Sequence, residues 1–170
     1  MTISIRDARP ARADRAWIEA AYHDYIHDLS AGATGVFPAL DVTGQSERDL
    51  LSHWFRGDYA TPLVILREGS PVGFALVERS RADGSPRWRM TEFFIRREER
   101  RRGLGREAAG LIFTRFEGDW LVSESVRNGD AVAFWRKVIG AWTRGRYRER
   151  LADGEVRHSF SSPPATARTV

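Results

Sequence analysis

The chain has 170 residues, 42% hydrophobic and 29% charged, which is the composition of one ordinary globular domain. It has no cysteine, which excludes disulfides, a thiolate nucleophile and cysteine-based metal sites. No apolar run approaches the ~20 residues of a membrane-spanning helix, and no signal-peptide layout is present, so we expect no membrane partner and a cytoplasmic location. The net charge of +4 comes almost wholly from arginine, because Lys137 is the only lysine.

The first third of the chain predicts a strand followed by two helices. Residues 3–6 alternate as a short strand does, and Asp14 is the expected N-cap of a helix reaching residue 29. The glycines and proline of residues 31–45 predict a loop. Ser46 resembles the start of a capping box, so a second helix is expected from there to Gly57.

The middle of the chain predicts three strands, at residues 61–67, 72–79 and 87–95. Short turn sequences, Gly-Ser-Pro at 69–71 and Asp-Gly-Ser-Pro at 83–86, separate them. Two tight turns in succession indicate an antiparallel meander.

The last third predicts helix, strand, helix and a terminal hairpin. Apolar residues recur at helical spacing over 104–116 and 128–139, with a strand at 120–126 between them. Residues 142–148 and 156–160 form the expected hairpin. The order predicts an α+β or mixed α/β domain over residues 1–160, followed by a disordered tail at 161–170.

An arginine-rich bend follows the third strand of the meander and leads into a helix. It reads Arg-Arg-Glu-Glu-Arg-Arg-Arg-Gly-Leu-Gly-Arg over residues 96–106. The first amides of a helix lack internal partners and the helix dipole makes that end positive, so a diphosphate can bind there. Gly103 and Gly105 would allow the phosphates to approach the backbone closely.

The bend resembles the acetyl-CoA pyrophosphate loop of GNAT N-acetyltransferases. The matching pattern is Ile95-x4-Arg100-x-x-Gly103-x-Gly105. A later segment, Asn128-x-x-Ala131-x-x-Phe134-Trp135-x4-Gly140, resembles the second signature of that family. The resemblance extends over about residues 3–160 and implies a twisted, mostly antiparallel sheet with helices on both faces.

The resemblance implies that acetyl-CoA is the acyl donor. The strand backbone at Phe93, Phe94 and Ile95 would bind the pantetheine arm, because a β-bulge splays neighbouring strands apart there. An amide near Phe94 or Ile95 would stabilise the oxyanion. Asn128 would contact the pantetheine or its sulfur. The pyrophosphate would be wrapped by Arg100, Arg101, Arg102, Gly103, Leu104, Gly105 and Arg106.

Glu92 is the candidate general base, acting directly or through water, because a strand carboxylate among apolar neighbours would have a raised pKa. An ion pair with a neighbouring arginine is the alternative reading. The family often has a tyrosine as general acid where this chain has Trp135, and an indole cannot protonate a thiolate. Tyr147 or water would then serve as the acid, unless none is needed.

The acceptor implied is a primary amine of a small molecule or peptide, delivered to a cleft that His27 and Asp28 would line. The alternative for these two residues is simple exposure near a helix end. Dimers are common in the family, so a homodimer is a further expectation. His23, His53 and His158 have no metal-ligand spacing, so no metal site is expected.

Three other readings stay open. The arginines could form a nucleic-acid-binding surface, although Glu98, Glu99 and Glu107 interrupt them. Gly103-x-Gly105-x-x-Ala108, with Glu124 further on, also satisfies a dinucleotide-binding fingerprint, but seven polar residues separate it from its strand. The chain could also bind CoA without catalysing a transfer.

Overall fold

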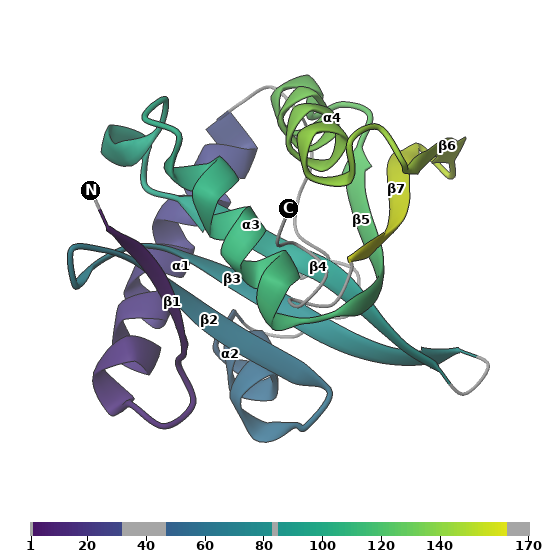
Figure 1. Ribbon diagram of the computed structural model, residues 1–170. Helices are drawn as coiled ribbons and strands as arrows, with labels where there is room; N and C mark the ends of the chain where they lie inside the picture. The colour runs from purple at the N-terminus through teal and green to yellow at the C-terminus, as the bar shows by residue number, and fades with distance from the viewer. Residues whose placement is uncertain (1, 32–46, 83–84, 163–170) are drawn as a thin grey trace.

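The computed structural model describes residues 2–31, 47–82 and 85–162, which form a seven-stranded sheet with helices on both faces (Figure 1). This confirms the expected mixed α/β class and the expected order of elements. That order is β1 (Ile3–Asp7), α1 (Arg12–Ala31), α2 (Glu47–Arg56), β2 (Ala60–Arg67), β3 (Ser70–Ala82), β4 (Ser85–Ile95), the 3₁₀ turn η2 (Arg97–Glu99), α3 (Leu104–Arg115), β5 (Gly118–Ser125), α4 (Gly129–Thr143), β6 (Arg148–Ala152) and β7 (Glu155–Ser162).

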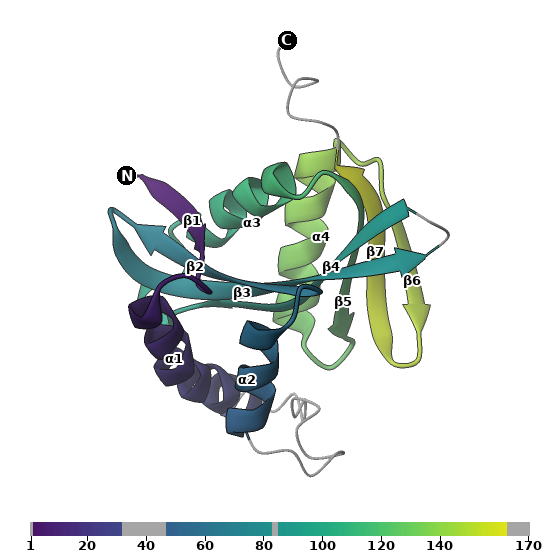
Figure 2. The same cartoon turned by 90° about the horizontal axis from the view of Figure 1, so that it is seen from below.

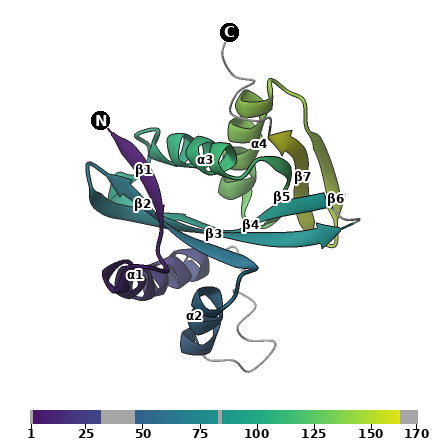
Figure 3. The same ribbon diagram turned by 60° about the horizontal axis from the view of Figure 1, so that its bottom comes forward.

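The sheet has the order β1-β2-β3-β4-β5-β7-β6. All neighbours are antiparallel except β4 and β5, which run parallel and are joined through α3. Helices α1 and α2 cover one face and α3 and α4 cover the other (Figures 2 and 3). No helix within the described ranges is both long and apolar enough to cross a lipid bilayer.

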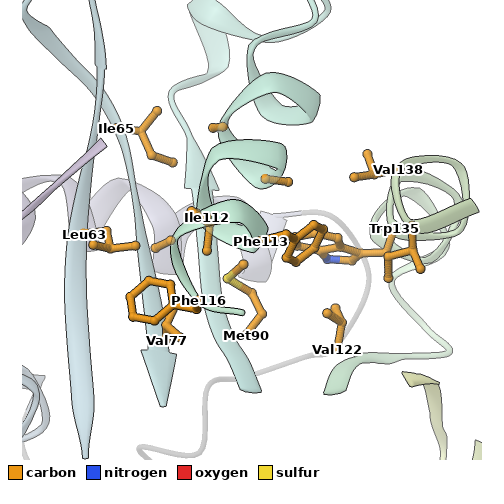
Figure 4. Close-up of a cluster of buried hydrophobic side chains, with 14 of the residues drawn as sticks. Leu63, Ile65, Val77, Met90, Ile112, Phe113, Phe116, Val122, Trp135 and Val138 are labelled. Atoms are coloured by element: carbon orange, nitrogen blue, oxygen red, sulfur yellow. The ribbon is translucent and has the colours of Figure 1, made fainter. Parts of the chain in front are cut away.

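The apolar side chains form one buried cluster on each face. The larger cluster packs α3 and α4 onto the sheet, with Phe113 and Trp135 near its centre (Figure 4). The second cluster packs α1 and α2 onto the opposite face, around Tyr22 and Phe74. Burial of such large side chains contributes roughly 1.5–3 kcal/mol each, so the two clusters fix the helices relative to β4 and β5.

A β-bulge in β4 decides which face its side chains reach. Leu76 of β3 pairs with Glu92 and Val77 pairs with Met90, so Thr91 is the extra residue. Its hydroxyl donates to the carbonyl of Leu76 at 3.1 Å. Beyond a bulge the alternation of side chains is reversed relative to the strand before it. Met90 therefore faces the α3/α4 cluster, whereas Phe94, four residues later, joins the α1/α2 cluster.

Several expected boundaries differ from the structure. Asp14 is not an N-cap, because α1 already begins at Arg12, and its buried carboxylate accepts two hydrogen bonds of 2.6 Å from Arg6. Helix α4 continues to Thr143, so the expected strand at 142–148 begins only at Arg148. Strand β7 reaches Ser162, so the first two residues of the expected tail belong to the sheet. Ser46, most of the expected loop and the rest of the tail lie outside the described residues.

Candidate active site

Strands β4 and β5 are paired only at their beginnings. Their pairing ends at Met90 and Val122, although β4 continues to Ile95 and β5 to Ser125. Figure 1 shows the two strands diverging from there. We call the region between residues 91–95 and 123–125 the seam. Along the seam, residues 91–95 of β4 have no partner strand on the side of β5. On β5, the buried hydroxyl of Ser123 has no hydrogen-bond partner among the described residues.

Glu92 lies at the edge of the seam and is held by α1. The bulge turns it toward the α1 face, where its carboxylate accepts a hydrogen bond from the hydroxyl of Tyr25. Burial raises the pKa of Glu92 to about 7, the Tyr25 bond opposes that rise, and repulsion from Glu124 and Glu78 adds to it. The ion pair with an arginine that was the alternative reading does not occur among the described contacts.

Glu124 lies on the other edge of the seam and is held by α4. The indole N–H of Trp135 donates to its carboxylate at 2.9 Å. Burial raises the pKa of Glu124 to about 7, the Trp135 bond opposes that rise, and repulsion from Glu155 of β7 adds to it. Two half-buried carboxyl groups with neutral-range pKa values therefore flank the seam.

The glycine loop presents backbone amides next to the seam. Gly103 has φ +81°, a left-handed conformation that glycine adopts without strain, and it caps the N-terminus of α3. Within the described residues the amides of residues 103–106 donate no hydrogen bond, and the first helical bond runs from Glu107 to Gly103. This is the cradle that a diphosphate requires, so the residues present fit the pyrophosphate of acetyl-CoA.

The arginines of the bend divide into anchored and free side chains. Arg100 forms an ion pair with Asp28, donates to the carbonyl of Ile95 at 2.7 Å and lies 5.5 Å from the Phe94 ring centroid. Its side chain thus ties the loop to α1 instead of pointing to a phosphate. Arg102 lies 3.7 Å from Glu99.

Arg101 and Arg106 remain available. Both side chains are exposed, and neither has an ion pair among the contacts of the described chain. Arg101 has φ +64°, so the chain turns sharply there, and Arg106 lies on the first turn of α3. These two guanidinium groups are the ones that can reach a ligand bound at the loop.

Gly105 is explained by packing between helices as much as by access to a ligand. A Cβ placed on it would lie 3.1 Å and 3.2 Å from two ring atoms of Phe134 on α4 and 3.7 Å from Phe93. The rings of Phe93 and Phe134 stack with centroids 5.8 Å apart. The glycine therefore allows α3 to approach the aromatic pair beside the seam, and Leu104, which precedes it, is buried beneath.

Asn128 caps α4. Its side-chain oxygen accepts a hydrogen bond from the amide of Ala131 at 3.3 Å, which satisfies one of the first amides of the helix. Asn128 follows Ser125, the last residue of β5, by three residues, so it lies at the end of α4 that connects to the strand bordering the seam. The expected contact with pantetheine remains a proposal.

His27 and Asp28 line a cavity on the α1 face. The cavity has a volume of about 150 Å³ and is bounded by the end of α1, Phe94 and the bend: Asp24, His27, Asp28, Phe94, Arg96, Arg97 and Glu98. Phe94 and Glu92 lie two residues apart on the same face of β4, so the cavity is on the α1 side of the sheet, as Glu92 is. Asp28 is also the anchor of Arg100, and Arg97 approaches it to 3.9 Å.

Tyr147 does not lie with Glu92. It follows the far end of α4, packs against the α3/α4 cluster and lies 5.8 Å from the ring of His158. It borders a separate hollow of about 760 Å³ beside Trp120 and Trp142. The seam lies at the end of β5, beside the N-terminal half of α4, whereas Tyr147 follows the C-terminal end of that helix, so the structure gives no support to Tyr147 as the acid.

Sequence reasoning missed Tyr25 and Glu124 as members of this site. Glu124 carried a detectable signal, since it alternates with Trp120 and Val122 on one face of its strand, and both of those are buried. A carboxylate on the inward face of a strand requires a partner or a function. Tyr25 had no comparable signal, because its spacing on α1 is that of an ordinary core residue.

Comparisons with known proteins identify the family of the chain and its fold. The sequence profile of the acetyltransferase (GNAT) family matches residues 15–141. Among solved structures, a GNAT-family acetyltransferase from Streptococcus agalactiae aligns with a TM-score of 0.69 at 14% identity, covering 94% of this chain and 95% of its own. No curated protein sequence matches the chain.

Two further solved structures share the fold. An acetyltransferase from Thermus thermophilus has a TM-score of 0.67 at 15% identity, covering 95% of this chain and 97% of its own. The ribosomal-protein-S18-alanine N-acetyltransferase from Escherichia coli has a TM-score of 0.61 at 16% identity, covering 99% of both chains. At these identities the likeness concerns the fold and not the substrate.

Proposed function

The chain belongs to the GNAT acetyltransferase family, and from this we propose that it transfers an acetyl group from acetyl-CoA to a primary amine of a small molecule or peptide. The observation that carries the proposal is the position of the unsatisfied amides of residues 103–106 beside the seam, with Glu92 at its edge. A donor bound there would have its diphosphate on α3 and its acyl arm between β4 and β5.

Within this arrangement the chain has two tasks. The unpaired edge of β4 at Phe93, Phe94 and Ile95 would hold the donor as a neighbouring strand would, and one of its amides would stabilise the oxyanion. Glu92 would take the proton from the attacking amine, since a base with a pKa near 7 is half ionised at neutral pH. Holding the amine and the acyl carbon together supplies much of the rate.

The acceptor would approach from the α1 face. The cavity lined by His27, Asp28 and Phe94 lies on the same face as Glu92, and its walls carry three carboxylates, from Asp24, Asp28 and Glu98. Arginines pair with Asp28 and Glu98, so the carboxylate of Asp24 is the one that would attract a cationic amine. The nucleic-acid reading loses support because Glu98 and Glu99 engage arginines of the bend.

A thermal-shift titration with acetyl-CoA tests the donor site. A ligand at 100 times its dissociation constant stabilises the folded protein by about 2.7 kcal/mol. Gly103→Glu should abolish this stabilisation by placing a charged side chain in the cradle. Gly154→Glu is the matched control, because Gly154 also has a positive φ (+75°) and open surroundings but lies in the β6–β7 turn.

A panel of amines tests the transfer itself. Kanamycin, spermidine, tyramine and a peptide amide with N-terminal alanine represent the main chemical classes, and release of the free CoA thiol reports turnover. Acetylation of at least one amine at a rate that Glu92→Gln lowers strongly is the expected result. Stabilisation by acetyl-CoA without any turnover would instead identify a CoA-binding protein without catalysis.

A further inference from the structure

Glu124 is a second desolvated carboxyl group in the seam, and the proposed reaction so far gives it no task. It lies two residues beyond the last pair between β5 and β4, as Glu92 does on the other strand. Within the described residues no arginine, lysine or histidine forms an ion pair with it, and its hydrogen-bond donor is the neutral indole of Trp135. A half-buried carboxyl group without a cation is costly to keep ionised.

The two carboxyl groups approach the seam from opposite faces of the sheet. The hydroxyl that holds Glu92 comes from α1, and the indole that holds Glu124 comes from α4. Each is fixed by a bond from a helix that packs on its own face, so neither depends on a mobile surface contact. A bond that lies in the seam would therefore have one carboxyl group on each side.

We propose that Glu124 is the acid that protonates the departing thiolate, and that Trp135 is the residue that positions it; this inference rests on the proposed acetyl transfer. The amine nitrogen forms a bond to the acyl carbon and the bond from that carbon to sulfur breaks. Glu92 takes one proton from the nitrogen, and the carboxylic acid of Glu124 gives one proton to the sulfur. The products are the amide and the free thiol, and a water-mediated transfer from Glu92 to Glu124 restores both groups.

The electrostatics of the seam let the two carboxyl groups share one proton. Glu92 from β4, Glu155 from β7 and the phenol of Tyr25 from α1 interact electrostatically with Glu124, and the contact from α4 is the neutral indole of Trp135. Two carboxyl groups that repel each other hold one proton between them over a range of pH. In that singly protonated state one group is a base and the other an acid, as the reaction requires.

The pH dependence of turnover with acetyl-CoA and the fastest amine of the panel tests the proposal. In the wild type kcat should fall at low pH, when Glu92 gains a proton, and at high pH, when Glu124 loses one. Glu124→Gln should lower kcat about 100-fold, a typical contribution of a general acid, remove the high-pH limb and leave the KM for acetyl-CoA within about twofold. A high-pH limb that survives in Glu124→Gln overturns the proposal, whatever the rate.

Trp135→Phe separates a positioning role from a structural one. The indole bond stabilises the ionised carboxylate, so its removal raises the pKa of Glu124 and should move the high-pH limb upward. An equal loss of rate at every pH, with the limb unmoved, would mean that Trp135 only fills space. Glu155→Gln is the control for Glu124→Gln, because it removes the same charge at a position outside the seam. Loss of its repulsion lowers the pKa of Glu124, so the high-pH limb should move slightly downward while the maximal rate stays unchanged.

A titration of the carboxyl groups by ¹³C NMR tests the pair without any acceptor. Removing the charge of Glu124 should lower the pKa of Glu92 in the Glu124→Gln variant, because repulsion from Glu124 is one of its causes. An unchanged Glu92 pKa overturns the proposal. Failure of the acetyl transfer itself shows in the wild type, as no thiol release from any amine, whereas failure of the Glu124 role shows only in the difference between variants.

Discussion

The hydroxyl of Tyr25 donates a hydrogen bond to the carboxylate of Glu92, and so joins α1 to the strand that borders the seam. Burial raises the pKa of Tyr25 well above its ordinary value, so the phenol stays protonated and acts as a donor. The bond favours the ionised form of Glu92 and opposes the effect of burial on it. The balance of these two effects sets the pH at which the proposed base becomes active.

Replacing Tyr25 by Phe should move the low-pH limb of kcat/KM upward by about one pH unit. A hydrogen bond to a charged group is worth about 1.5–3 kcal/mol, and 1.36 kcal/mol corresponds to one pKa unit. Without the bond the pKa of Glu92 rises, so the base ionises at higher pH. Tyr59→Phe, which changes an exposed tyrosine outside the seam, should leave the profile in place.

Glu92→Gln should stabilise the folded protein at pH 8 and leave its stability nearly unchanged at pH 5. The pKa of Glu92 is about 7 in the folded protein against an ordinary 4.5, so the unfolded state loses its proton first and stability falls as pH rises from 4.5 through 7. Glutamine mimics the protonated form and avoids this loss, by up to about 3 kcal/mol. Urea denaturation at the two pH values measures the difference. A variant less stable than the wild type at pH 8 would contradict the raised pKa.

The order of secondary structure could be predicted from the sequence because it depends on local signals. Gly103 and Gly105 marked the loop before α3, and the turn sequences between β2, β3 and β4 marked the antiparallel meander, as the structure has them. The sequence also predicts that Glu92 lies on the strand that ends at Ile95, and β4 confirms this.

The partners of the site residues could not be predicted, because they depend on which face each side chain reaches. The extra residue at Thr91 reverses the alternation of β4, and nothing in the local sequence marks a bulge there. The bulge carries Glu92 to Tyr25, which is 67 residues earlier in the chain. In the same way the sequence predicts Asp14 as a helix cap, whereas its actual role, an ion pair with Arg6, depends on the packing of β1 against α1.

Arg101→Ala and Arg106→Ala should each weaken acetyl-CoA binding about tenfold. One charge-assisted hydrogen bond to phosphate is worth about 1.5 kcal/mol or more, and neither guanidinium has another partner among the described residues. The loss should shrink in high salt, because ions screen exposed charges. Calorimetry at two salt concentrations measures both effects.

The comparison for this prediction is Arg100→Met, which removes the tie between the loop and Asp28. It should lower the melting temperature but leave the salt dependence of binding as in the wild type, since its side chain points to α1. Arg136→Ala, which breaks an exposed ion pair with Glu149 on the outer side of α4, should change neither. Unchanged binding in both Arg101→Ala and Arg106→Ala would place the phosphates elsewhere.

Gly105→Ala should destabilise the protein by up to about 2 kcal/mol, and Phe134→Leu should remove that cost. Alanine is the better helix former by about 1 kcal/mol, but its methyl group would press on the Phe134 ring, and overpacking typically costs 1–3 kcal/mol. A smaller side chain at 134 relieves the contact, so a double-mutant cycle should give a clear coupling.

Gly103→Ala is also destabilising, through its positive φ, but nothing lies near its added methyl group, so it should not couple to Phe134. Chemical denaturation of the variants measures these energies, and additive effects of Gly105→Ala and Phe134→Leu would show that the approach of α3 to α4 does not require glycine at 105.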